Sequence, residues 1–275
     1  MTSSEAIGTS LVGKVALITG AGSGLGAAFA RRLAHDGATV IVNDLSTEAV
    51  AAVADQLNAD LAIFDVSNAD DFDRSVDQVV ARHGKIDIMI NNAGIAPPVS
   101  EQRFERGLAN QLLRMEGRIS EMAAQENVTT LSNDEWDRMI RVHLYGAFYG
   151  TRAALRHMQL ARSGAIVNIS SVLGLNPSGS AAHYAAAKAG VIALTKSAAL
   201  ETAHLGIRIN AVCPGFIDTP LLSGFNEILR SSITMRIASG RMGDASEVAE
   251  LVRFLVGPES SYCTGDVFSA SGGYA

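Results

Sequence analysis

A tyrosine and a lysine four positions apart are the residues of this sequence best suited to proton transfer. Tyr184 and Lys188 fall in a predicted helix, so their side chains share one face, and Ser171 lies 13 residues before Tyr184. An ammonium beside a phenol favours the phenolate, and moving a phenol pKa from about 10 to about 7 takes roughly 4 kcal/mol, which we expect the lysine and the positive nicotinamide ring of a cofactor to supply together. Tyr184 would then exchange a proton with an alcohol or carbonyl oxygen that Ser171 holds. Tyrosine–lysine pairs at this spacing also arise by chance on helices, so the pair alone does not establish the chemistry.

A glycine-rich turn follows the first predicted strand. Residues 19–26 read T-G-A-G-S-G-L-G and lead into a predicted helix. Glycines let the backbone approach a pyrophosphate, whose charge the amides at a helix N-terminus can meet. The spacing differs from a strict G-x-G-x-x-G, and no Gly-Lys-Ser/Thr follows that would indicate a P-loop. A glycine-rich turn without a ligand is the alternative. If a cofactor with a pyrophosphate binds at this turn, the residues expected to contact it are Gly20, Ser23, Gly24, Leu25 and Gly26.

Two acidic residues follow the next two predicted strands. Asp44 lies 18 positions after Gly26, where a carboxylate can accept both hydroxyls of an adenosine ribose and repel a 2′-phosphate. No arginine or lysine occurs in residues 40–56 to hold such a phosphate, so NAD is favoured over NADP. Asp65 and Val66 are expected where an adenine ring lies. An ordinary helix N-cap or turn residue is the alternative for Asp44, and a plain cap for the next helix is the alternative for Asp65.

Short apolar strands alternate with helices along most of the chain. The predicted strands are nearly all apolar, as expected when helices cover both faces of a parallel sheet. We therefore predict an α/β fold, a single-domain Rossmann-type doubly wound sheet of about seven strands over residues 13–275, after a flexible segment 1–12. The predicted strands are 15–19, 39–43, 61–64, 86–91, 165–170, 208–213 and 266–269, and the main helices are 25–35, 48–57, 70–83, 133–158 and 182–203.

An insertion interrupts this alternation at residues 97–133. Its apolar residues recur at helical spacing and predict one long amphipathic helix: Phe104, Leu108, Leu112, Met115, Ile119 and Met122. Because ligands bind at the carboxyl edge of such sheets, we hypothesise that this helix forms a wall over a long apolar substrate, with its arginines meeting an acyl-carrier phosphate. A solvent-exposed helix packed on a neighbouring subunit is the alternative.

Composition excludes several classes of protein. The chain has 275 residues, 48% of them hydrophobic, which excludes an intrinsically disordered chain. A net charge of −6 argues against a general nucleic-acid or membrane-surface binder. Cys213 and Cys263 form no C-x-x-C pair, and no cluster has metal-ligand spacing, so neither a disulfide framework nor a metal is expected. Residues 1–10 do not read as a signal peptide, and a cytoplasmic protein is expected.

The ordered motifs resemble the short-chain dehydrogenase/reductase family. The resemblance covers about residues 14–273 and rests on T-G-x3-G-x-G at 19–26, N-N-A-G at 91–94, Ser171, Tyr184-x3-Lys188 and Pro214-Gly215. It implies a seven-stranded Rossmann sheet, a homotetramer, and hydride transfer between a nicotinamide cofactor and an alcohol or ketone. It also implies that Lys188 holds the nicotinamide ribose hydroxyls. Further cofactor residues implied by the resemblance are Asn92, Ala93, Gly94, Pro214, Gly215, Ile217 and Thr219.

One catalytic position departs from the family pattern. The family commonly has an asparagine in an N-x-x-G motif, which completes a water-linked proton relay to the lysine. Here residues 142–146 read V-H-L-Y-G, so His143 takes that place. Similar histidines occur in hydroxyacyl-CoA dehydrogenase members of the family. An imidazole can hold the relay water or itself carry a proton, and a hydrogen bond to a carbonyl within a buried helix is the alternative.

These inferences predict an NAD-dependent oxidoreductase for small-molecule secondary alcohols and ketones, with Ser171, Tyr184, Lys188 and His143 as catalytic residues. A β-hydroxyacyl/β-ketoacyl thioester, as for a 3-oxoacyl reductase, is the favoured substrate because of His143 and the insertion. A hydroxysteroid or another bulky secondary alcohol is the alternative. A non-catalytic NAD-binding sensor is a third possibility, which the intact Ser171, Tyr184 and Lys188 disfavour. Neither a nucleic acid nor a membrane is expected as a partner.

Overall fold

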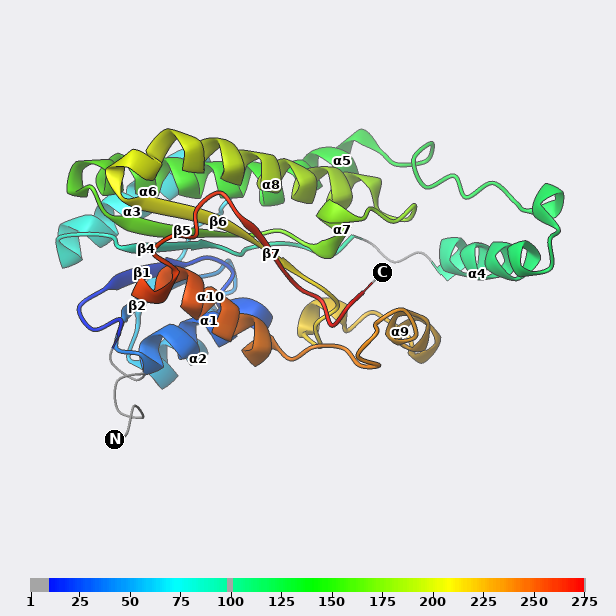
Figure 1. The fold of residues 1–275 in the computed structure, drawn as a ribbon, viewed down its shortest axis with the longest axis horizontal. Coiled ribbons are helices and arrows are strands. Elements are labelled where there is room, and N and C mark those ends of the chain that lie inside the picture. The colour runs from blue at the N-terminus through cyan, green and yellow to red at the C-terminus, as the bar shows by residue number, and fades with distance from the viewer. Residues whose placement is uncertain (1–9, 98–100, 275) are drawn as a thin grey trace.

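Seven parallel strands form one sheet in the order β3-β2-β1-β4-β5-β6-β7 (Figure 1). This is a computed structural model that describes residues 10–97 and 101–274. Strand order reverses between β1 and β4, which creates a crevice at the carboxyl ends of the strands. The predicted Rossmann-like α/β fold is confirmed. The strands are β1 Val15–Ile18, β2 Thr39–Asn43, β3 Asp60–Ala62, β4 Ile88–Asn91, β5 Gly164–Ile169, β6 Ile207–Pro214 and β7 Val267–Ala270.

Helices cover both faces of the sheet. Figure 1 shows α1 (Gly24–His35), α2 (Thr47–Leu57) and α10 (Ala245–Val256) below the sheet, and α3, α6 and α8 above it. The upper helices span Ala69–His83, Gly146–Ala161 and Ala182–Thr202. Shorter helices lie near the carboxyl edge or in the insertion: α4 Glu101–Met115, α5 Asn133–Ile140, α7 Val172–Leu175 and α9 Glu227–Thr234. Single 3-10 turns span Ile119–Glu121, Ala203–Leu205, Pro220–Leu222 and Pro258–Ser260.

The strands are apolar throughout because each contributes to two cores. In β1, Ala16 and Ile18 pack with the lower helices, while Val15 and Leu17 pack with the upper ones. Alternate side chains of a strand point to opposite faces, so both sets must be apolar when both faces are covered.

The insertion contains a shorter helix than predicted. Helix α4 ends at Met115, and Gly117 adopts a left-handed backbone with φ of 75°. The amides of Gly117 and Arg118 then donate to the carbonyls of Arg114 and Leu113, which is the Schellman arrangement that ends a helix. The prediction of one helix reaching Met122 is therefore wrong, and Gly117 was the signal against it.

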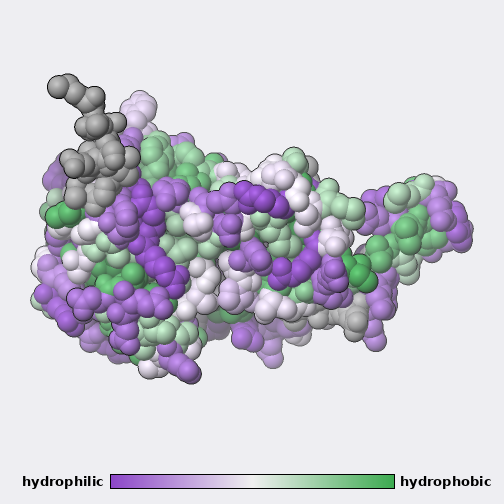
Figure 2. All heavy atoms as spheres, turned by 90° about the horizontal axis from the view of Figure 1, so that it is seen from below, coloured by the Kyte–Doolittle hydropathy of each residue, from purple (hydrophilic) through white to green (hydrophobic). Residues whose placement is uncertain are grey.

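The insertion folds back on itself as an arm. The Asn110 amide donates to the carbonyl of Ala123 at 2.6 Å and accepts from its N–H at 2.9 Å, so the returning chain lies along α4. Figures 1 and 2 show α4 projecting from the body, with apolar and polar side chains together on its surface. Leu112 and Met115, both on the apolar stripe, are 55% and 78% exposed.

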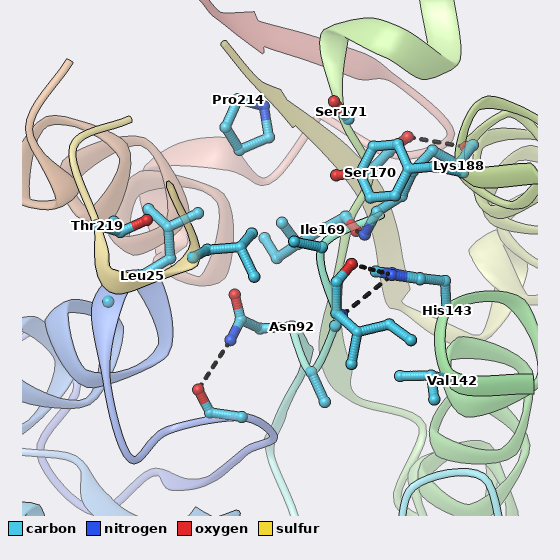
Figure 3. Close-up of a pocket in the computed structure, with 18 of the residues that line it drawn as sticks. Leu25, Asn92, Val142, His143, Ile169, Ser170, Ser171, Lys188, Pro214 and Thr219 are labelled. Carbon is cyan, nitrogen blue, oxygen red and sulfur yellow. Dashed lines mark hydrogen bonds between the residues drawn. The ribbon is translucent and has the colours of Figure 1, made fainter. Parts of the chain in front are cut away.

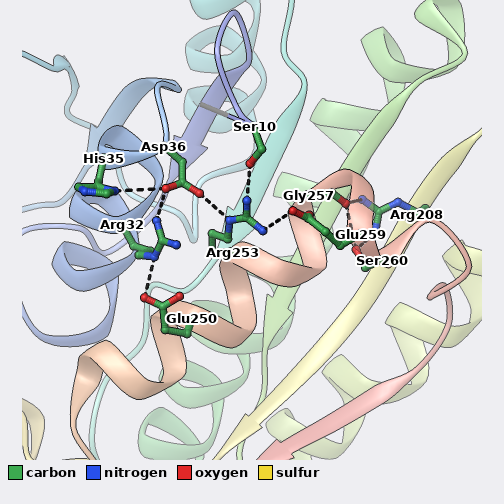
Figure 4. A network of polar contacts seen from close by, with 10 residues as sticks. All are labelled: Ser10, Arg32, His35, Asp36, Arg208, Glu250, Arg253, Gly257, Glu259 and Ser260. Atoms are coloured by element: carbon green, nitrogen blue, oxygen red, sulfur yellow. Dashed lines mark hydrogen bonds and ion pairs between the residues drawn. The ribbon is translucent and has the colours of Figure 1, made fainter. Parts of the chain in front are cut away.

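A buried ion-pair network joins α1 to α10 (Figure 4). The Asp36 side chain, which follows α1, is fully buried, and its Oδ2 accepts from Arg253 Nε at 2.5 Å. Arg32 and His35 contact the other carboxylate oxygen, and Arg253 also reaches Glu259 at 2.7 Å. Burial alone raises the pKa of Asp36, but the hydrogen bonds from Arg253 and Arg32 outweigh it and hold that pKa below its usual value.

The described residues contain no helix long and apolar enough to cross a bilayer. Within the same ranges, Cys213 and Cys263 are free thiols, and no group of histidine, cysteine and acidic side chains could hold a metal ion.

Candidate active site

A pocket of about 630 Å³ lies at the carboxyl edge of the sheet. Segments far apart in the sequence line it, including the ends of β1, β2, β4, β5 and β6, and Figure 3 shows several of their side chains facing one cavity. Every residue predicted at the site lines this pocket except Gly26. They are Gly20, Ser23, Gly24, Leu25, Asp44, Asp65, Val66, Asn92, Ala93, Gly94, His143, Ser171, Tyr184, Lys188, Pro214, Gly215, Ile217 and Thr219.

The glycine-rich turn is held by the N-N-A-G segment. The Asn92 amide donates to the carbonyls of Thr19 and Gly20 at 2.9 and 3.1 Å, and Figure 3 shows this side chain pointing at the turn. The Thr19 hydroxyl accepts from the backbone amides of Asn92 and Ala93. Asn92 therefore shapes the turn as well as lining the pocket.

Gly26 supports the turn from behind. A Cβ at this position would lie 2.1 Å from the Gly20 carbonyl oxygen, so only glycine lets α1 start this close to the turn. Gly20 has a left-handed backbone with φ of 64°, and a Cβ there would meet Ala93 Cα at 2.7 Å. These two glycines therefore let the turn pack closely between the start of α1 and Ala93, with the free amides of the first turn of α1 beside it.

The two predicted cofactor aspartates lie in turns, and neither caps the helix that follows. Ser46 caps α2 and Asn68 caps α3. Asp44 accepts from the Gly22 amide at 3.0 Å and from the Ser46 amide at 3.2 Å, which fixes the carboxylate beside the glycine turn. Asp65 accepts from the Ser67 amide at 2.8 Å.

Ser171, Tyr184 and Lys188 come together from β5, α7 and α8. Lys188 donates from Nζ to the Ile169 carbonyl at 2.8 Å, and Nζ lies 5.7 Å from the centre of the Tyr184 ring. The Ser171 hydroxyl accepts from the Leu173 amide at 3.1 Å as the N-cap of α7. Gly174 in α7 was not singled out from the sequence. A Cβ there would lie 2.9 Å from the Lys188 carbonyl carbon, so this glycine lets α7 approach α8.

Burial governs the protonation of Tyr184 and Lys188. Burial raises the pKa of Tyr184, and the neighbouring Ser171 hydroxyl only partly offsets this. Burial also lowers the pKa of Lys188 to about 7. Lys188 by itself does not acidify the phenol, so acidification by Lys188 together with a positive nicotinamide ring stays a prediction. Near neutral pH, Tyr184 is a protonated phenol beside an amine that is only partly charged.

His143 lies in a π-helical turn, Arg141–Tyr145, between α5 and α6. Its Nε2 is 3.1 Å from the Ile95 amide nitrogen and 3.0 Å from the Ile95 carbonyl oxygen, so the tautomer decides which of the two it binds. Burial, together with the positive charge of Lys188, lowers the His143 pKa well below its usual value, so the imidazole is neutral. Its ring stands edge-on to Tyr184, with centroids 5.2 Å apart. A Cβ at Gly94 would lie 2.5 Å from this imidazole, so His143 requires glycine there.

A second cavity lies behind His143. Its volume of about 10 Å³ is just enough for one water molecule, and His143, Lys188 and Asn91 all line it. Nδ1 of His143 and Oδ1 of Asn91 have no hydrogen-bond partner among the described residues. The amide nitrogen of Asn91 donates to Asn168 Oδ1 at 2.7 Å, which fixes the orientation of this amide. Asn91 was not predicted as a site residue.

Apolar residues outside the predicted set line the other end of the pocket. They come from α7 and from the segment after the Pro-Gly turn: Val172, Leu173, Phe216, Leu221, Leu222 and Phe225. The predicted wall is not found: within the described part of the insertion, Pro97 lines the pocket and no residue of α4 does. The arm contacts the loop that precedes α8: the Asn127 amide donates to the carbonyl of Gly179 at 2.9 Å. Gly179 lies five residues before Tyr184 in the sequence.

Comparison with known proteins identifies the class. A model of the short chain dehydrogenase family matches residues 14–229, and the chain belongs to this family of oxidoreductases. A 3-oxoacyl-[acyl-carrier-protein] reductase of Thermotoga maritima is 38% identical over 268 residues, covering 96% of this chain and 98% of the relative. A cis-4-hydroxycyclohexanecarboxylate dehydrogenase of Sinomonas cyclohexanicum is 37% identical over 272 residues, covering 98% and 99%.

The fold also matches a solved structure. A crystal structure titled ribose-5-phosphate isomerase from Brucella melitensis 16M superposes with a TM-score of 0.83 at 33% identity, covering 96% of this chain and 93% of that one. Similar folds host different reactions, so the reaction of this chain must be argued from its site.

Proposed function

We propose that this protein interconverts a ketone and a secondary alcohol with NAD(H), and that its substrate is a 3-oxoacyl or 3-hydroxyacyl thioester. The observation that carries the proposal is the meeting of Ser171, Tyr184 and Lys188 in the same pocket as the glycine-rich turn. A protein that only senses NAD has no use for a buried phenol and amine. We further propose the homotetramer that the family resemblance implies.

The residues present fit a dinucleotide. The first turn of α1 offers backbone amides to a pyrophosphate, and Gly20 lets the preceding turn lie against the backbone of Ala93. The Asp44 carboxylate is anchored beside that turn, where it can accept ribose hydroxyls. Residues 40–56 supply no cation for a 2′-phosphate, which supports NAD over NADP. The other proposed contacts, including Asp65, Val66, Ile217 and Thr219, line the same pocket.

The protonation state of Tyr184 supports the reductive direction near neutral pH. When bound, the reduced nicotinamide supplies a hydride to the carbonyl carbon. Ser171 holds the carbonyl oxygen by a hydrogen bond, and Tyr184 donates its phenolic proton to that oxygen, so the product is a neutral alcohol. Because burial raises the pKa of Tyr184, the phenol is already in the donor form. Lys188 then stabilises the phenolate that remains.

We propose that His143 and Asn91 hold a water molecule that returns a proton toward Lys188. The cavity behind His143 has room for one water and is lined by all three residues. The polar atoms left without a protein partner, His143 Nδ1 and Asn91 Oδ1, are the partners such a water needs. A neutral imidazole can accept or donate there, so the histidine can replace the amide that is common in the family.

The choice of substrate rests on the apolar end of the pocket and on the relatives. Phe216, Leu221 and Phe225 offer an apolar surface suited to an acyl chain, and one relative bears the name of a 3-oxoacyl reductase. A bulky cyclic secondary alcohol is the second candidate, because a relative of similar identity is named for a cyclohexane-ring substrate.

The proposed function is tested by the absorbance of the reduced cofactor. A 3-oxoacyl thioester with NADH at pH 7 should consume the reduced cofactor, and cyclic and steroidal secondary alcohols with NAD at pH 9 form the comparison panel. Faster turnover of the cyclic alcohols assigns the second candidate. Cofactor binding without turnover of any substrate would contradict an enzymatic role and favour a sensor.

Replacing Asp44 should change the choice of cofactor. We expect Asp44→Ala to lower kcat/KM for NADH by about 10- to 100-fold, since hydrogen bonds to a charged group contribute about 1.5–3 kcal/mol. The kcat/KM for NADPH should stay the same or rise, because the substitution removes a carboxylate that repels the 2′-phosphate. Steady-state kinetics with both cofactors measures the ratio, and Glu48→Ala, an exposed site on α2, is the control. An unchanged NADH-to-NADPH ratio rules out the assignment.

Replacing His143 tests the proton relay. We expect His143→Ala to lower kcat by about 10²-fold, at the lower end of acid–base contributions, with little change in the KM for cofactor. His143→Asn should recover most of this loss, because an amide can also hold the water. The pH profile of kcat is measured for both variants. If His143 had only a structural role, His143→Asn would not restore the wild-type pH profile. Wild-type kcat in a folded His143→Ala protein would contradict the relay.

A further inference from the structure

The C-terminal residues pack against the pocket from behind. After β7, the chain passes the Pro-Gly turn, where the Gly215 amide donates to the Ala270 carbonyl at 2.9 Å. A Cβ at Gly215 would lie 2.7 Å from Ser271 Cα, so the two backbones are in close contact. The tail therefore touches the segment that leads from β6 into the apolar end of the pocket.

Two glycines turn this tail toward α9. Gly272 and Gly273 have left-handed backbones with φ of 61° and 78°. The Ser239 amide donates to the Gly272 carbonyl at 2.9 Å, and Ile237 and Tyr274 form an antiparallel bridge. The loop that follows α9 is thus attached to the tail by backbone hydrogen bonding.

The Tyr274 ring lies between this loop and the pocket wall. It is 9% exposed, and its centroid is 5.1 Å from that of Phe216. The guanidinium carbon of Arg236 lies 4.7 Å from the Tyr274 centroid, within the range of a cation–π contact. One aromatic ring therefore connects the loop after α9 with the phenylalanine that follows the Pro-Gly turn.

The cluster around Tyr274 shares side chains with the pocket. Val172, Phe216 and Phe225 belong both to this apolar cluster and to the lining of the cavity. Residues 217–243, which contain α9, are joined to each other where Ile217 pairs with Gly243. Residues 237–239 of this segment are also bonded to the C-terminal tail, which attaches α9 to the sheet.

We propose that Tyr274 is a positioning residue that fixes Phe216 and α9 and so sets the width of the apolar end of the substrate pocket. The proposal rests on the proposed function for its substrate readout. It predicts that the ring, rather than the phenolic hydroxyl, does the positioning, because the contacts with Phe216 and Arg236 are made by the ring. The cofactor end of the pocket, built from the turns after β1, β2 and β4, lies outside this cluster.

The test compares Tyr274→Ala with Tyr274→Phe. We expect Tyr274→Ala to raise the KM for a 3-oxoacyl thioester about tenfold, while kcat changes less than about threefold and the Kd for NADH is unchanged, because only the substrate end loses its support. Tyr274→Phe should behave like the wild type. Tyr262→Ala is the matched control, since that side chain is fully exposed. An unchanged KM in Tyr274→Ala, or equal damage in Tyr274→Phe, overturns the proposal.

Hydrogen exchange separates this proposal from the substrate assignment. Amides in residues 220–239 should exchange faster in Tyr274→Ala than in Tyr274→Phe, with the amides of β1, β4 and β5 unaffected. This readout needs no turnover, so a wild-type protein that is inactive on thioesters refutes the proposed substrate while the exchange result still decides the role of Tyr274. Faster exchange across the whole sheet would show general destabilisation and would overturn the positioning role.

Discussion

Tyr184→Phe is expected to lower kcat by about 10³-fold or more and to leave the Kd for NADH within about twofold. The substitution removes only the phenolic hydroxyl, which is the proposed proton donor, and keeps the ring that packs beside His143 and Lys188. The carbonyl oxygen would then develop negative charge with only the Ser171 hydroxyl to stabilise it. Pre-steady-state hydride transfer, followed by cofactor absorbance, separates the chemical step from product release. Tyr262→Phe, at an exposed position, is the control.

The pH dependence follows from the same phenol. Burial raises the pKa of Tyr184, so its acid form prevails at neutral pH and is lost only as pH rises through that pKa. Ketone reduction needs the acid and should be insensitive to Tyr184 ionisation near neutrality. Alcohol oxidation needs the phenolate and should accelerate as pH rises. Undiminished turnover in Tyr184→Phe, or an oxidation rate that does not increase above pH 8, would contradict the assignment of Tyr184 as acid and base.

The strands and the residues at their carboxyl ends could be predicted, because runs of apolar residues along the sequence indicate the strands and the motifs follow those runs. A strand covered on both faces must be apolar throughout, as Val15 to Ile18 are. The glycines, Asp44 and Asn92 follow such strands, and parallel strands all end at one edge of the sheet. Motif order therefore predicted which residues would meet around the pocket, apart from Gly26, whose role is to let α1 approach the turn.

The remaining features depend on contacts between distant segments, which no local pattern contains. The apolar stripe of the insertion predicted a helix but not what covers it, and α4 lies away from the pocket with Leu112 and Met115 exposed. Asn91 faces the small cavity because its amide is oriented by Asn168, 77 residues away. Tyr274 reaches Phe216 only through two left-handed glycines near the end of the chain.

Protonation also escaped prediction, because it depends on burial as much as on neighbours. The predicted acidification of Tyr184 combines Lys188 with a positive nicotinamide ring; in the protein alone both side chains are buried, and burial disfavours both charged forms. A neutral phenol beside an amine with a pKa of about 7 costs less than a buried ion pair in the protein alone. In the proposed ketone reduction, this neutral phenol would be the proton donor.

Asp36→Asn is expected to lower the free energy of unfolding by about 3 kcal/mol, since removing one partner of a buried ion pair costs about 3–5 kcal/mol and the amide oxygen can still accept one hydrogen bond. Arg253, which is 8% exposed, would lose its fully buried counter-ion and retain Glu259 at the surface. The melting temperature should fall by roughly 10 °C. Calorimetry measures both effects, and Asp55→Asn on the exposed side of α2 is the matched control. Because the network lies at α1 and α10, residual activity below the melting temperature should be unchanged.

The acid dependence of the Asp36→Asn effect identifies its cause. The folded pKa of Asp36 lies below its unfolded value, so the carboxylate stabilises the fold fully above the unfolded pKa of about 4 and loses this contribution as pH falls through the folded pKa. The melting temperatures of wild type and Asp36→Asn should therefore differ by a constant amount between pH 5 and pH 8 and converge below about pH 4. A carboxylate and an amide have nearly the same shape and differ chiefly in the charge that pairs with Arg253, and in acid the protonated Asp36 is neutral like the amide. A difference in melting temperature that persists into acid would therefore assign the loss to something other than this charge.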